Sequence, residues 1–430
     1  MNTLESRVIS FLGFIYILLM PWHQGIRLIS TNIFIVAWKD VVLLSALVGM
    51  LLYFQSRRKS MAWSSLFKML LILFLFVIAV SLFQGGTALV LEASLYMFGS
   101  ACSGFFIYNQ MSMIKKNPKL SLQLKLVFIS GILLAIWMLL ENPLNLVIIP
   151  EIADTEAPTF ERFDYFRAKG PFDSPMAASL YMWFFTFFGL GCALCCNLRR
   201  DRFLSATLSL LACCAILIGL SRGPLVLLFL SFLVFVILSL IYYPLPFLKW
   251  SSLFLALILL AYLGKDFYLT FLETNVFKDL LSSVFDPSES SNSIRQDRWQ
   301  AGIKSFYNTF PLGRGVSFIN EKALVGTGEI FENSWLCLHS GLGIIGLFYA
   351  TFFFCLLIWF GFQGIRFLGA EFSSRVFCFF PAVLGLPLAV YMWQFPVLSS
   401  RFGCMIFWMT FGIGLYFVDQ VSSLAPKDFQ

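Results

Sequence analysis

Apolar residues run along the chain in long blocks, and short polar connectors separate one block from the next. One block, "SLYMWFFTFFGLGCALCC" (179–196), contains no charged residue. A helix needs about 20 mostly apolar residues to cross a bilayer, whereas barrel strands alternate apolar and polar positions. The pattern predicts an all-α polytopic membrane protein with a single integral membrane domain over residues 1–430. We count about twelve spans: 8–22, 39–55, 65–84, 88–107, 122–140, 176–197, 203–220, 224–243, 250–264, 335–360, 376–393 and 403–418.

The connectors predict the orientation of these spans, because Lys and Arg concentrate in cytoplasmic loops. The basic connectors "SRRKS" (56–60), "KKNP" (115–118) and "NLRRDR" (197–202), together with Lys249 and the 361–375 segment, all fall on one side. We therefore expect that side, and both termini, to be cytoplasmic.

Two polar segments then fall on the opposite, outer side, namely 141–175 and the large loop 265–334 between spans nine and ten. Within the large loop we expect a short amphipathic helix that starts with Ser293 as N-cap and stops at Pro311 and Gly313. Such a helix is typical of one that lies on a membrane surface. Its apolar arc consists of Trp299, Ile303, Phe306 and Tyr307.

The amino-acid composition limits which ligands and cofactors the chain is expected to bind. The chain of 430 residues is 59% hydrophobic and 12% charged, and its net charge of +7 is spread over the connectors, which argues against nucleic-acid binding. The ten cysteines lie in or beside apolar blocks and form no disulfide or zinc pattern, and two histidines cannot build a multi-histidine metal site. No glycine loop followed by lysine is present for nucleotide phosphates. We expect no metal and no cofactor.

Basic side chains also occur on the outer side, where the orientation rule does not favour them. Each alone could be an anchor whose charged end reaches the headgroup layer. Together they indicate a bound polyanion, because guanidinium groups bind phosphate oxygens through paired hydrogen bonds. The candidates are Arg167 and Lys169 in "FRAKGPFDSP", Arg222 in "GLSRGPL", Arg295 and Arg298 in "IRQDRW", Arg314 in "PLGRG" and Arg401 in "LSSRFG".

The stretch "ENSWLCLHSGLGIIG" (332–346) brings polar groups to the outer start of span ten. Glu332 and His339 are two helical turns apart, so they share a face, which Gly343 and Gly346 extend as small residues that favour helix packing. A carboxylate at this helix N-terminus could orient a hydroxyl or accept its proton. Alternatively, Glu332 or Asn333 could simply cap the helix, and His339 could be a satisfied buried side chain.

These pieces, in this order, resemble the family of O-antigen ligases and O-antigen polymerases of bacterial surface polysaccharide assembly. The resemblance covers roughly residues 160–350 and rests on "RAKGPFDSP", "SRG" (221–223), "RQDRWQAGIKSFYNTFPLGRG" and "ENSWLCLHSGLGIIG". Where the ligases usually carry a histidine before the asparagine, this chain has Glu332, and His339 does not match that position. This departure favours the polymerase.

The resemblance implies a metal-independent glycosyltransferase of the bacterial plasma membrane that uses a polyprenyl-diphosphate-linked oligosaccharide. Arg167, Arg295 and Glu332 would be catalytic, while Arg222, Arg298, Arg314, Lys169, Asn333 and His339 would bind substrate. Membrane lipids, a flippase and a chain-length regulator are the implied partners. Three alternatives remain: a ligase that transfers glycan to lipid A–core, a transporter of the same lipid-linked glycan, and a non-catalytic scaffold in a polysaccharide complex. A transporter should show polar pairs near mid-membrane, and few are present.

Overall fold

The computed structural model describes the helical bundle and the turns that join its helices at either end. It describes residues 4–23, 26, 37–56, 95–141, 161–162, 165–166, 168–172, 174–219, 221–242, 290–314, 333–366, 379–393, 397–398 and 400–424. Predicted spans 65–84 and 250–264 lie outside the described residues.

The regular secondary structure of the described residues is helical apart from one short antiparallel pair, β1 (Glu161–Arg162) and β2 (Tyr165–Phe166), in which Glu161 pairs with Phe166. Seven of the described helices are long and apolar enough to cross a membrane, which confirms the prediction of an all-α polytopic membrane protein. These seven are α1 (Leu4–Leu19, continued by the 3₁₀ turn η1, Met20–Trp22), α8 (Leu122–Glu141), α9 (Pro175–Cys195), α10 (Arg199–Ile218), α11 (Arg222–Tyr242), α17 (Ile344–Arg366) and α20 (Arg401–Leu424).

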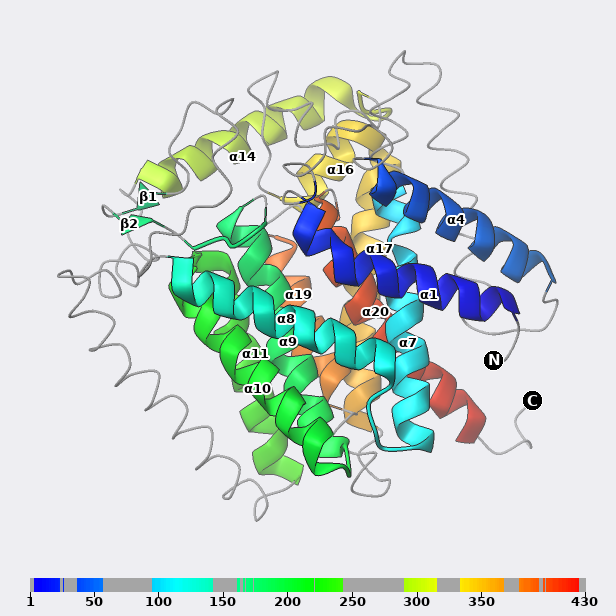
Figure 1. The fold of residues 1–430 in the computed structure, drawn as a ribbon. Coiled ribbons are helices and arrows are strands. Elements are labelled where there is room, and N and C mark those ends of the chain that lie inside the picture. Colours follow the sequence, from blue (N-terminus) through cyan, green and yellow to red (C-terminus); the bar gives the residue numbers. More distant parts are fainter. Residues whose placement is uncertain are drawn as a thin grey trace.

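Other described helices complete the bundle or lie across its end (Figure 1). They are α4 (Trp38–Ser56), the π-helical turn η2 (Leu95–Gly99), α7 (Ala101–Lys116), α14 (Ser290–Thr309), α16 (Ser334–Leu342) and α19 (Phe380–Tyr391). Of these, α4, α7 and α19 fall within or beside the predicted spans 39–55, 88–107 and 376–393.

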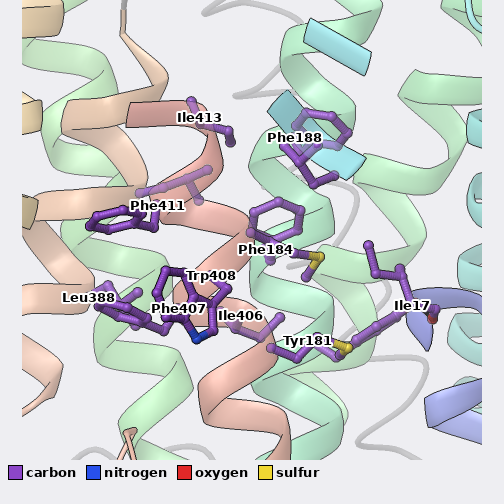
Figure 2. Packing of buried hydrophobic residues seen from close by; sticks show 14 of the residues in the cluster. Ile17, Tyr181, Phe184, Phe188, Leu388, Ile406, Phe407, Trp408, Phe411 and Ile413 are labelled. Carbon is purple, nitrogen blue, oxygen red and sulfur yellow. Dashed lines mark hydrogen bonds between the residues drawn. The ribbon is translucent and has the colours of Figure 1, made fainter. Parts of the chain in front are cut away.

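Helices α9 and α20 form the centre of the bundle, since most of each is buried by neighbouring helices. Figure 2 shows the aromatic and aliphatic side chains that fill the space around them, including Phe184 and Phe188 of α9 and Phe407, Trp408 and Phe411 of α20. Rings of Phe407 and Trp408 meet nearly edge to face, with centroids 5.5 Å apart. Tilted and edge-to-face arrangements of this kind are the favourable geometries for aromatic pairs.

Close backbone approach joins α7 to α20. A Cβ atom added at Gly104 would overlap the carbonyl of Trp408, and one added at Gly412 would overlap the carbonyl of Gly104. Small residues at such crossings let membrane helices pack through their backbones. The indole of Trp408 adds a hydrogen bond, because its Nε1 donates to the carbonyl of Met97 over 2.7 Å.

The bundle has two distinguishable ends. At one end α14 contacts α16 (Figure 1), and we call this the α14 end. Hydrogen bonds place the C-terminal end of α19 there, since Ser334 N donates to Met392 O over 3.1 Å. Ring packing of Phe172 on Phe402, with centroids 5.2 Å apart, places the turn before α9 and the start of α20 at the same end.

At the opposite end, the connector between α7 and α8 is hydrogen-bonded to the segment that joins α9 to α10. Asn197 N donates to Pro118 O over 2.8 Å, and Leu120 N donates to Asp201 Oδ2 over the same distance. Lys125 Nζ, on α8, lies 2.9 Å from Asp201 Oδ1. The buried carboxylate of Asp201, at the start of α10, therefore binds both the connector before α8 and α8 itself.

Two predicted elements need correction. Span 335–360 is not one helix: α16 ends at Leu342, Gly343 adopts φ +61°, and α17 begins at Ile344. The helix of the outer loop begins at Ser290 rather than after an N-cap at Ser293, so Ser293 lies within its first turn. Its stop was correct, since α14 ends at Thr309.

Candidate functional site

Buried cations distinguish the α14 end from the opposite end. Lys39, Lys169 and Arg222 are only 6%, 3% and 6% exposed. At the opposite end most of the described basic side chains are exposed, as expected for charges that water solvates; they include Lys115, Lys116, Arg199, Arg200 and Arg202. Burying a charge costs several kcal/mol unless other groups compensate it. The α14 end therefore carries positive charge where packing alone does not favour it.

Lys169 lies in a tight turn that a carboxylate organises. Glu141, the last residue of α8, accepts hydrogen bonds through Oε2 from the backbone N–H groups of Lys169 (2.8 Å) and Gly170 (2.6 Å). Gly170 has φ +57°, a conformation that glycine adopts without strain. Phe172 anchors the end of the turn against Tyr181 and Phe402. The carboxylate thus fixes the backbone of the turn, and its negative charge lies near the Lys169 ammonium.

Arg222 is the first residue of α11, and its turn packs against two other helices. A Cβ atom added at Gly219 would overlap the hydroxyl of Ser179 on α9, and one added at Gly223 would lie 2.6 Å from the hydroxyl of Tyr391 on α19. The helix macrodipole places partial positive charge at an N-terminus, so a cation there is unfavourable. No acidic residue occupies the first turn of α11 to offset it.

A third basic group lies where α4, η2 and α20 meet. Lys39 Nζ donates to the hydroxyl of Tyr96 and lies 3.2 Å from Asp40 Oδ1. The guanidinium carbon of Arg401, the first residue of α20, lies 4.9 Å from the centroid of the Tyr96 ring. Lys39, Lys169, Arg222 and Arg401 together form what we call the basic end, with one cation in or beside the N-terminus of each of four helices.

Asn333 acts as the N-cap of α16. Its Oδ1 accepts hydrogen bonds from Trp335 N (2.8 Å) and Leu336 N (3.2 Å), and its Nδ2 donates to Trp393 O over 2.9 Å. Both polar atoms of the side chain are therefore used in fixing α16 beside the end of α19. This is the capping alternative that the sequence left open.

His339 belongs to α16, is 1% exposed, and packs against α14 and the residue that follows it. Its ring centroid lies 4.0 Å from that of Phe306 and 6.4 Å from that of Phe310. Burial lowers the pKa of the imidazole below its usual value, so the neutral ring is favoured. These contacts are those of a packed side chain that fastens α14 to the bundle.

The other predicted site residues differ in how far the structure describes them. Arg167 and Glu332 lie outside the described residues, and Arg295 lies on α14 with only its backbone described. Arg298 and Arg314 are partly exposed at the α14 end, and Arg314 N donates to Ser340 O over 2.7 Å. The structure thus gathers Lys169, Arg222, Arg298, Arg314, Asn333 and His339 at one end of the bundle.

Sequence reasoning did not single out Lys39, Tyr96 or Glu141. A charged pair, Lys39–Asp40, at the first positions of an apolar block was the available signal for Lys39. For Tyr96 and Glu141 the sequence carries no such signal, because their roles depend on partners 57 and 28 residues away in sequence. Among the residues that the structure describes, no group of three His, Cys, Asp or Glu side chains could hold a metal ion.

The fold and this site define the chain as a helical membrane protein with buried positive charge at one end of its bundle. An arrangement of this kind can bind a polyanion such as a diphosphate, through guanidinium and ammonium groups and through the helix N-termini themselves. A comparison with protein families and with curated proteins finds no family model and no curated protein that matches the chain.

Proposed function

We propose that the protein is a membrane glycosyltransferase that polymerises polyprenyl-diphosphate-linked oligosaccharide repeat units of a bacterial surface polysaccharide. The observation that supports it most is the burial of Lys169, in the turn that leads into α9, and of Arg222, the first residue of the neighbouring helix α11. Each charge and each helix N-terminus attracts a negative group to the same end of the bundle. The diphosphate of a lipid carrier supplies such a group at the membrane boundary.

The proposed topology has about twelve spans, with both termini in the cytoplasm and the large loop outside. The exposed basic residues at the opposite end, which include Lys115, Lys116, Arg199 and Arg200, support a cytoplasmic location for that end. The basic end and α14 would then face the outer surface of the plasma membrane, where lipid-linked repeat units are joined.

In the proposed reaction, an acceptor hydroxyl oxygen attacks the anomeric carbon of the donor sugar. The bond from that carbon to the diphosphate oxygen breaks, and the electron pair leaves with the diphosphate. Arg222 and Lys169, with Arg167 and Arg295, stabilise the charge that develops on the leaving group. Glu332 accepts the hydroxyl proton. Since the diphosphate is already a good leaving group, binding and orientation supply most of the acceleration.

Reconstitution tests this proposal. Purified protein in liposomes is supplied with a polyprenyl-diphosphate-linked oligosaccharide, and products are resolved as a ladder of increasing length. Arg222→Ala should lower the rate of ladder formation by about 100-fold, the typical effect of removing one group that stabilises developing charge. Arg222→Lys should be intermediate, because lysine keeps the charge but cannot bind phosphate through two parallel hydrogen bonds.

Arg200→Ala is the matched control, since it removes an exposed arginine from the opposite end and should leave the rate unchanged. Transfer to added lipid A–core without chain growth would assign the protein to the ligases instead. Glycan movement across the membrane without any new glycosidic bond would assign it to the transporters.

A further inference from the structure

A buried carboxylate stands at the end of α8, where helix structure alone does not favour it. Glu141 is the last residue of α8 and is 2% exposed. The macrodipole places partial negative charge at a helix C-terminus, so an acidic side chain there is unfavourable. The last turn of α8 contains no basic residue that would offset this effect. The reason for an acid at this position therefore lies outside its own helix.

The partners of Glu141 are two successive backbone N–H groups in the turn that leads into α9. Its Oε2 accepts hydrogen bonds from Lys169 N over 2.8 Å and from Gly170 N over 2.6 Å. The turn lies directly against α8, since a Cβ atom added at Gly170 would come within 3.2 Å of Met138 Cγ. Phe172 N donates to Lys169 O over 3.3 Å and closes the turn. One oxygen atom of Glu141 thus fixes the backbone from which the Lys169 side chain extends.

The same carboxylate also balances charge. Lys169 is 3% exposed, and the negative charge of Glu141 lies near its ammonium. A buried cation is costly unless a nearby anion or hydrogen bonds compensate it. Positioning the backbone and balancing the charge need different chemistry. An amide oxygen can accept both N–H groups, because it has two lone pairs, but it carries no charge. The two roles can therefore be separated by substitution.

We propose that Glu141 is a positioning residue, which holds the turn so that the Lys169 ammonium contacts the diphosphate at the α14 end. The inference rests on the proposed function, in which Lys169 stabilises the leaving diphosphate. Glu141 acts through Lys169 rather than by touching the lipid carrier, because its carboxylate repels an anionic headgroup and its Oε2 is bonded to the turn. The charge of Glu141 therefore lowers the affinity for a diphosphate, whereas its hydrogen bonds raise it.

The affinity of the full-length protein for farnesyl diphosphate, measured by isothermal titration calorimetry, tests the two roles separately. Glu141→Gln and Glu141→Ala both remove the charge, and only Glu141→Ala removes the acceptor for the turn, so the difference between them isolates positioning. Glu141→Ala should bind about tenfold more weakly than Glu141→Gln, the loss expected when one hydrogen bond from a charged group to the ligand is lost. Glu141→Gln should bind at least as tightly as the wild type.

A Lys169→Ala background shows whether Glu141 acts through Lys169. In that background Glu141→Ala and Glu141→Gln should bind farnesyl diphosphate within about twofold of each other, because the side chain that they position is absent. Two residues that contributed independently would instead keep the full difference.

Asp201 supplies the matched control at the opposite end of the bundle. Its carboxylate is also 2% exposed, accepts a hydrogen bond from Leu120 N and lies 2.9 Å from Lys125 Nζ. Asp201→Ala and Asp201→Asn should differ in melting temperature and bind farnesyl diphosphate equally. A difference in affinity as large as that between the Glu141 variants would show that the loss of any buried acceptor weakens binding, and would overturn the positioning role.

The outcomes separate this inference from the function on which it rests. Equal affinities of Glu141→Ala and Glu141→Gln would overturn the inference, and so would a difference that persists in the Lys169→Ala background. Ladder formation by the wild type would still support the proposed function in either case. If the affinities are as expected and the wild type forms no ladder, the proposed function fails and the positioning role stands. A wild type that does not bind farnesyl diphosphate would contradict both.

Discussion

Individual side chains at the α14 end divide into those that fasten helices and those that carry charge. His339 belongs to the first kind. Its ring lies 4.0 Å from Phe306 and is buried, and burial lowers its pKa because the charged imidazolium would lose its hydration. The neutral ring is therefore part of the contact between α14 and α16.

This contact should weaken in acid. A histidine whose pKa is lowered in the folded protein contributes stability above its unfolded pKa, about 6.5, and that stability is lost as the pH falls through the unfolded value toward the folded one. The melting temperature of the purified wild type should therefore fall between pH 7.5 and pH 5 by more than that of His339→Phe, which keeps an aromatic ring but cannot titrate. His23, the other histidine, is present in both proteins and cancels in the difference. Equal slopes with pH would show that His339 does not titrate in this range.

At the scale of elements, the turn after α14 and the junction between α16 and α17 form one backbone unit. Arg314 N donates to Ser340 O over 2.7 Å, and Ile344 N donates to Pro311 O over 2.8 Å. Gly313 and Gly343 adopt φ +75° and +61°, and a Cβ atom on either would overlap the backbone of the other segment. The two glycine-rich segments thus hold α14, with Arg295 and Arg298, over the end of the bundle.

Substituting Gly343 tests this unit. Gly343→Ala should destabilise the protein by about 1–3 kcal/mol, because alanine is strained at positive φ and its Cβ would displace the 310–314 turn. The change is measured as a drop in melting temperature, and limited proteolysis should cut within α14 sooner than in the wild type. Gly49→Ala is the control. Gly49 lies within helix α4, where alanine is favoured, and an added Cβ would make an ordinary 3.4 Å contact with Ile9 on α1. Equal stability of Gly343→Ala and Gly49→Ala would show that the two segments are not tightly docked.

The elements themselves were largely predictable from local pattern. Apolar blocks such as 122–140 and 176–197 correspond to α8 and α9 within two residues, because a membrane helix needs only length and hydrophobicity. The break at Gly343 was not predictable, since "HSGLGIIG" has the small-residue spacing of a continuous packed helix. What breaks the helix there is the 310–314 turn, a segment distant in sequence, which bonds to its backbone.

At the scale of the whole molecule, positive charge is treated differently at the two ends of the bundle. Lys and Arg side chains such as Lys115 and Arg199 are exposed at one end, whereas Lys169 and Arg222 are buried at the other. Burial of a charge is costly, and the dipole of a helix disfavours a cation at its N-terminus. The sequence singled out Lys169 and Arg222 as candidates for polyanion binding, because both stand in connectors of the predicted outer side, where the orientation rule does not favour cations. It could not predict that Lys39 joins Arg401 at Tyr96, since that contact depends on how distant helices pack.

A cryo-electron microscopy structure with bound polyprenyl diphosphate tests the central claim most directly. We predict density for a diphosphate in contact with the side chains of Lys169 and Arg222, at the end of the bundle that α14 crosses. Density for the headgroup at the opposite end, beside Arg199 and Arg200, or a diphosphate that contacts neither Lys169 nor Arg222, would contradict the account.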